Sequence, residues 1–185
     1  MDLNCQISPD LYILNKYNKL YPWIPNSEQI RPTGMNILMK ERMIDKINNE
    51  YNSLKDYFLI DLFKYDFIKN NKNKYQIIKD NNIKLHKFQV CRFKYDIHPK
   101  TFHYIMWYTC DKKYLSDGEV NKDIINSIFN IIKDDKFTFV WYENPKMSIP
   151  EIYHIQVFWI KLDNHNLFDS LSILKLISSN LLVNS

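Results

Sequence analysis

The sequence predicts an α+β domain in which N-terminal helices precede a central antiparallel or mixed sheet and a C-terminal helix closes the chain. Apolar residues recur at three- and four-residue spacing in the first third of the chain and again near its end, which is typical of amphipathic helices. Between these regions, runs of β-branched and aromatic residues surround one capped helical segment. The resulting order of strand, helix, strand, strand favours the α+β class.

Three helices are predicted ahead of the sheet. The first spans about Asp10 to Tyr21, and a proline-rich connector follows it as far as Pro32. The second spans Met35 to Glu50, where apolar side chains again recur at helical spacing. The third begins after Ser53, because Ser53 and Asp56 have the spacing of an N-terminal cap.

The strands are predicted from short aromatic and β-branched runs. The segment Asp66 to Asn82 is rich in Asn and Lys, so we expect a loop around one short strand there. Further strands are expected at Ile83 to Val90, Phe102 to Tyr108, Phe137 to Glu143 and Ile152 to Lys161.

Two helices are predicted within and after the sheet. Ser116 and Glu119 form a capping-box pattern directly ahead of an apolar stripe that includes Val120 and Ile124. A last helix is expected from Asn166 to Leu182, with leucines and an isoleucine on its inner side.

Length and composition favour one domain. The 185 residues include 45% hydrophobic residues, enough for a core without disulfides or metals. Within it we distinguish a helix and connector at 1–32, a core at 33–162 and the closing helix at 163–185. The sequence does not indicate an oligomeric state.

Charge and cysteine content limit the partners and the compartment. Only three of the 25 basic residues are arginines, and lysines alternate with acidic residues, so no dedicated nucleic-acid surface is expected. No apolar run approaches the ~20 residues of a membrane span. Three unpaired cysteines and the absence of a signal peptide predict reduced thiols and a cytoplasmic location. Abundant Ile, Asn and Lys beside scarce Gly and Arg are typical of an AT-rich genome.

Polar side chains on three predicted strands are the candidates for a site. Strand alternation puts His154 and Gln156 on one face, and it puts His103 and Trp107 together on another strand. Glu143 ends a third strand beside Trp141, and Asn144 begins the next turn. If these strands are neighbours, His103, Glu143 or Asn144, His154 and Gln156 converge.

Three segments resemble the fungal N-acetylglucosamine-induced protein family, a domain of unknown function. The matching residues are Tyr51, Ser53 and Tyr57, then His103 and Trp107, then Asn144, Ser148, Ile149, Pro150 and His154. The resemblance covers about residues 30 to 160 and implies a shared fold and a shared site. Two departures stand out: the family's Asn-Asp-aromatic-Pro-Tyr run is here Cys91 to Tyr95, and its second histidine is here Gln156.

A His-x-Gln pair on a strand, together with the preceding strand and helix order, is also similar to histidine-triad and galactose-1-phosphate uridylyltransferase-like proteins. That resemblance implies that His154 attacks phosphorus and that Gln156 holds the phosphate. A neutral imidazole suits such an attack near pH 7. The sequence hypothesis is therefore a domain that binds a nucleotide or a sugar phosphate, as a transferase or hydrolase, with His103 and Asn144 in support.

Two other functions stay open from the sequence. Trp107 or Trp141, the latter with Glu143, would stack a base, cap or glycan in a non-catalytic binding module. Alternatively, all of these residues belong to the core of an interaction protein. Neither a metal nor another cofactor is expected, because the sequence has no HxxxH, HxH or CxxC spacing.

Overall fold

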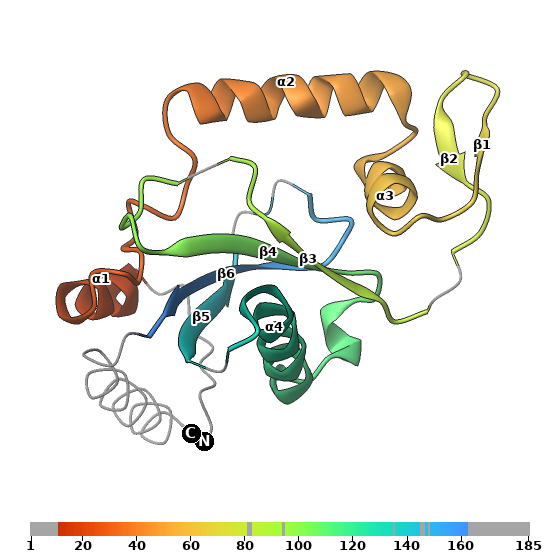
Figure 1. Ribbon diagram of the computed structural model, residues 1–185. Helices are drawn as coiled ribbons and strands as arrows, with labels where there is room; N and C mark the ends of the chain where they lie inside the picture. The colour runs from red at the N-terminus through yellow and green to blue at the C-terminus, as the bar shows by residue number, and fades with distance from the viewer. Residues whose placement is uncertain are drawn as a thin grey trace.

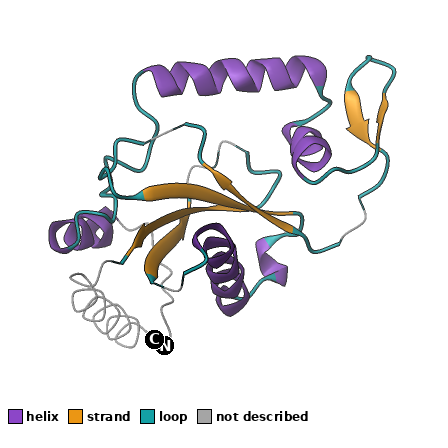
Figure 2. Ribbon diagram, in the orientation of Figure 1, coloured by secondary structure: helices purple, strands orange, loops and turns teal. Residues whose placement is uncertain are grey.

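A four-stranded antiparallel sheet with helices on both faces forms the centre of the molecule (Figures 1 and 2). The computed structural model describes residues 11–80, 83–93, 95–134, 136–144, 147 and 149–162. The α+β class predicted from the sequence is confirmed. The predicted C-terminal helix lies outside the described residues. No helix within the described part of the chain is long and apolar enough to cross a membrane.

The sheet has the strand order β3-β4-β6-β5, and each neighbouring pair is antiparallel. Its strands are β3 (His86–Val90), β4 (Phe102–Tyr108), β5 (Phe137–Glu143) and β6 (His154–Lys161). Between β4 and β5 the chain forms the short 3-10 helix η2 (Lys112–Tyr114) and the helix α4 (Asp117–Ile132). Six of the eight residues of β6 are buried, because strands flank it on both sides and helices cover both of its faces.

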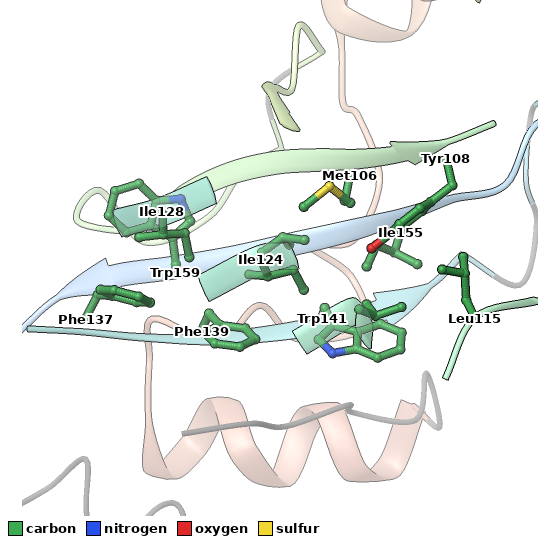
Figure 3. Packing of buried hydrophobic residues seen from close by; sticks show 12 residues of the cluster. Met106, Tyr108, Leu115, Ile124, Ile128, Phe137, Phe139, Trp141, Ile155 and Trp159 are labelled. Carbon is green, nitrogen blue, oxygen red and sulfur yellow. The ribbon is translucent and has the colours of Figure 1, made fainter. Parts of the chain in front are cut away.

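Helix α4 covers one face of the sheet. Its apolar stripe of Val120, Ile124 and Ile128 is fully buried. The stripe packs on the alternate side chains of the strands, among them Trp141 and Trp159 (Figure 3). The predicted cap is present, since the Ser116 hydroxyl accepts from the backbone of Glu119 and the Glu119 carboxylate accepts from the backbone of Ser116.

Replacing Ser116 with alanine is expected to lower the free energy of unfolding by about 1 kcal/mol, because the first turn of α4 then loses an acceptor for a backbone N–H. Urea denaturation measures this. Ser127→Ala, a substitution in the middle of the same helix, is the matched control and should leave the midpoint unchanged or raise it slightly. Equal midpoints for the two variants would contradict the capping role.

Two separate segments of the chain cover parts of the other face, namely α1 with the connector after it and α3 with the turn that follows. Helix α1 (Leu11–Leu20) and the connector after it pack on β5 and β6, with Leu14 and Trp23 against Tyr142 and Phe158. Helix α3 (Leu54–Tyr57) runs into the π-helical turn η1 (Phe58–Leu62). There the ring of Phe58 stacks on Trp107 of β4 at 4.1 Å between centroids.

Helix α2 (Met35–Glu50) crosses above this face without joining the core (Figure 1). The predicted bounds are confirmed, but Ile47 is the one buried residue of its 16. Leu38 and Met39, part of the predicted apolar stripe, are 47% and 51% exposed. The helix begins after Gly34, whose φ of 52° is a conformation that side chains other than glycine's rarely adopt. Helix α2 therefore acts as a cover with open space beneath it.

The segment between η1 and β3 differs from the prediction. Two short strands, β1 (Phe67–Lys69) and β2 (Tyr75–Ile77), form an antiparallel hairpin where one strand was expected. All three residues of β1 are exposed. The strand therefore has no buried face, and its sequence lacks the alternation of apolar and polar residues from which a strand is predicted. The turn is closed by the Asn70 side chain, which accepts from the backbone of Lys72 and Lys74 at 2.9 and 3.1 Å.

Candidate functional site

The two central polar residues lie on the sheet face that α2 crosses. On β6, His154, Gln156 and Phe158 point to this face, while Ile155 and Val157 belong to the cluster beneath α4. The predicted alternation along this strand is confirmed. His154 lies opposite Trp107 of β4, and Gln156 lies between Ile105 of β4 and Tyr142 of β5. Both residues therefore lie on a strand that is paired on both sides at Gln156 and with β4 at His154.

A pocket opens between this face and α2. It is lined by α2, by the turn η1, by residues 89–93 and Tyr95, by β4 and β6, and by Asn144 and Ile149. The pocket has a cavity volume of about 130 Å³, close to that of a cavity that holds a ring the size of benzene. Of the residues predicted for a site, Asn144, His154, Gln156 and Trp107 line it. The register of β4 with β6 brings Trp107 beside His154, and Asn144 directly follows β5.

The imidazole of His154 is fixed in one tautomer. Its Nδ1 lies 2.9 Å from the carbonyl oxygen of Ile152, so Nδ1 carries the hydrogen and donates it. Burial lowers the pKa of His154, and the nearby Lys40 ammonium lowers it further, against the bond to Ile152. The ring is therefore neutral near pH 7. Among the described residues no group forms a hydrogen bond with Nε2. In this tautomer Nε2 carries the lone pair of the ring, and this lone pair can interact with a ligand in the pocket.

His103 orients Gln156 from behind the pocket wall. The ring of His103 is buried between Tyr95 and Phe158, and its Nε2 lies 2.7 Å from Oε1 of Gln156. Burial lowers the pKa of His103 to about 4, so the ring is neutral and Nε2–H is the donor. With Oε1 engaged in this way, the amide NH₂ of Gln156 is left as a donor toward the pocket. His103 is a positioning residue and does not line the pocket itself.

Charged residues complete the pocket wall, and sequence reasoning missed them. Lys40 of α2 is half-buried, and burial lowers the pKa of its ammonium group. Arg92 follows β3, and Asp61 lies on η1. Cys91 lies beside Lys40 in the wall, and burial raises the pKa of its thiol to about 11, so it is a poor nucleophile. The one sequence signal for this part of the wall was the run from Cys91 to Tyr95 in the family resemblance.

Besides His103, two of the predicted site residues lie outside the pocket wall. Trp141 is fully buried beneath α4, where its Nε1–H donates to Asn121 at 2.7 Å. Glu143 points to the same side as Trp141 and accepts from the hydroxyl of Tyr153 at 2.9 Å. Neither side chain lines the pocket, because side chains alternate along β5, and Val140 and Tyr142 are among the residues that face the α2 side.

Trp107 lines the pocket but has no free face. Its indole stacks on Phe58 at 4.1 Å and on His154 at 4.5 Å, with interplanar angles of 26° and 28°. Both contacts occupy the indole inside the protein, and they give no support to the stacking role predicted for Trp107. The indole packs against the imidazole of His154 and supports it.

The donor set in the described residues does not form a metal centre. No group of three or more His, Cys, Asp or Glu side chains is placed to hold an ion in that part of the chain. The chemistry that the pocket offers is a neutral imidazole, an amide donor, two cations and one carboxylate. Such a set suits an anion that also carries hydrogen-bond donors.

Comparison with known proteins does not assign the chain to a family. No protein-family model and no curated protein sequence matches it. The chain is similar to one solved protein, the crystal structure of HTC1, with a TM-score of 0.42 and 12% identity over 84% of this chain and 88% of that one. Likeness at this distance carries no argument about function. The resemblance to the fungal N-acetylglucosamine-induced family stays a prediction, and the function has to be argued from the pocket.

Proposed function

We propose that the pocket binds a small phosphorylated molecule, a nucleotide or a sugar phosphate, and that Nε2 of His154 attacks its phosphorus in a transferase or hydrolase reaction. The observation that carries the proposal is the state of His154. A neutral ring, with Nδ1–H held by the Ile152 carbonyl and Nε2 unbonded among the described residues, is prepared for nucleophilic attack.

The surroundings of His154 favour a phosphate ligand. Gln156, two residues along the same strand, offers its amide N–H groups because His103 occupies its oxygen. Lys40 and Arg92 place positive charge in the same wall. Such donors stabilise the charge that builds up on the equatorial oxygens of phosphorus during transfer.

The reaction would proceed in two steps. In the first, the lone pair of Nε2 forms a bond to phosphorus while the bond from phosphorus to the leaving oxygen breaks, and that oxygen keeps the electron pair. The Ile152 carbonyl stabilises the cationic ring that results, because Nδ1–H stays bonded to it. In the second step, water or an acceptor hydroxyl attacks phosphorus, and the electrons of the N–P bond return to the imidazole. The attacking oxygen releases its proton to solvent, which balances the proton that the leaving oxygen of the first step takes up.

Label transfer to the protein tests this function. The full chain is incubated with ATP and UTP labelled at the α-phosphorus and with labelled glucose 1-phosphate. The expected result is a covalent label that acid removes and alkali does not, as for a phosphorus–nitrogen bond. His154→Gln should abolish the label. His86→Gln should keep it, because His86 lies on β3 and its ring is 3.5 Å from Asp123 of α4.

Binding is measured beside labelling. A probe at 100 times its dissociation constant stabilises the protein by about 2.7 kcal/mol, which thermal denaturation detects. Stabilisation without label would show that His154 is a ligand of the phosphate and not a nucleophile. Absence of both label and stabilisation with every probe would overturn the proposed function.

A further inference from the structure

Asp61 forms a second polar part of the pocket wall, in addition to the part formed by His154 and Gln156. These two parts are called the Asp61 end and the His154 end. Asp61 lies on η1 and lines the pocket, and its Oδ2 accepts a hydrogen bond from the hydroxyl of Tyr51. Burial raises the pKa of Tyr51, and the bond to Asp61 raises it further, so this hydroxyl stays a donor. The ring of Tyr51 is in turn held edge-on by Tyr57 of α3, at 5.2 Å between centroids. Asp61 is thus oriented from behind, as Gln156 is by His103.

A stack of rings connects η1, the turn that carries Asp61, with the imidazole of His154. Phe58, which is on the same turn as Asp61, stacks on Trp107, and Trp107 stacks on His154. The two polar ends therefore lie on different elements, η1 and β6, with the indole of β4 between Phe58 and His154. Lys40 is close enough to His154 and Cys91 to influence the pKa of both. The positive charge of Lys40 accordingly lies at the His154 end.

The two ends differ in what they bind. A phosphate is attracted to Lys40 at the His154 end and repelled by the Asp61 carboxylate, since like charges at short range oppose each other. With Oδ2 engaged by Tyr51, Oδ1 of Asp61 is an acceptor for a donor on the ligand. Hydroxyl groups of a sugar are donors of this kind, and apolar side chains of α2, Met43 and Ile44, line the wall beside them.

We infer that Asp61 binds a hydroxyl group of a sugar whose phosphate lies at His154, so that the substrate is a sugar phosphate, either free or as part of a nucleotide. This inference rests on the proposed function and narrows it. It excludes inorganic phosphate, pyrophosphate and polyphosphate as preferred ligands, because none of them offers a hydroxyl donor beside its phosphate. Asp61 is then the residue that determines specificity.

Calorimetric titration of the full chain with ribose 5-phosphate and with inorganic phosphate tests the inference. The unaltered protein should bind ribose 5-phosphate about tenfold or more tightly than phosphate, the effect of one hydrogen bond to a charged group. Asp61→Ala should reduce this ratio to about one, while phosphate binds equally well or more tightly. Tyr51→Phe, which keeps the carboxylate and removes its support, should give a ratio between these two.

Asp66→Ala is the matched control. It removes the same charge a few residues along the chain, at an exposed position outside the pocket wall, and the tenfold ratio should persist. Adenosine 5′-monophosphate separates the two sources of the same chemistry. If it binds more tightly than ribose 5-phosphate, the ligand is a nucleotide, and otherwise it is a free sugar phosphate.

The failures of the inference and of the proposed function differ. A ratio of about one in the unaltered protein, or an undiminished ratio in Asp61→Ala, would overturn the role of Asp61 and leave phosphate binding at His154 intact. If the unaltered protein binds neither ribose 5-phosphate nor inorganic phosphate, the proposed function itself is wrong.

Discussion

Asp56→Ala is expected to lower the free energy of unfolding by about 3 to 4 kcal/mol. The carboxylate of Asp56 is 6% exposed and accepts from the backbone of Ile77 at 2.8 Å and from the hydroxyl of Ser53 at 2.6 Å. It therefore joins the start of α3 to the β1–β2 hairpin. Alanine would leave both donors unpaired inside the protein, with a cavity beside them.

Denaturant unfolding, followed by fluorescence, measures this loss. Asp56→Asn keeps an oxygen for the N–H of Ile77 and removes the charge, so about half of the loss is expected. Asp111→Ala removes a carboxylate whose side chain is 76% exposed and should change the unfolding free energy by less than about 0.5 kcal/mol. A loss below 1 kcal/mol for Asp56→Ala would show that the hairpin is held by other contacts.

Acid is expected to destabilise the protein through His103, by about 3 kcal/mol between pH 7 and pH 4. The pKa of this ring is about 4 in the folded protein, mainly because of burial, and about 6.5 in the unfolded chain. Between these values the unfolded state binds a proton that the folded state does not. The stabilisation is therefore complete above pH 6.5 and is lost as the pH falls through this window. Burial also lowers the pKa of His154, which acts in the same direction.

Chemical denaturation at a series of pH values tests the dependence. The variant His103→Gln keeps a hydrogen-bonding side chain next to Gln156 but does not titrate. It should be less stable than the unaltered protein at pH 7, and its stability should fall about 3 kcal/mol less on acidification to pH 4. Parallel curves for the two proteins would mean that the pKa of His103 is the same in the folded and unfolded states, and the lowering of its pKa by burial would then be wrong.

Much of the fold could be predicted because periodicity is a local property. The bounds of α2, β4 and β5 agree with those predicted, and the capping box of Ser116 marks the start of α4 correctly. The hairpin of β1 and β2 could not be found in this way. Its strands have three residues each, and what pairs them is the Asn70 turn and the distant Asp56 carboxylate.

The candidate site was predictable only in part. His154, Gln156 and Asn144 were found because strand alternation and neighbouring strands place them together. Glu143 and Trp141 were named as candidates but face the other side of the sheet. Alternation predicts which residues of one strand share a face, but it does not predict which of the two faces carries the site. His103 was expected in the pocket and instead acts from behind it, through Gln156.

The sequence by itself determined the α+β class, the order of the elements and the shared face of His154 and Gln156, since each of these depends on residues close together in the chain. Tertiary structure alone decided that Trp107 is covered on both sides by Phe58 and His154, and that α2 crosses the sheet face with Ile47 as its one buried residue. It also brought Lys40 and Asp61 to the pocket. The physical reason is that a charged side chain has no periodic signature, so its place in a pocket is set by how separate elements pack.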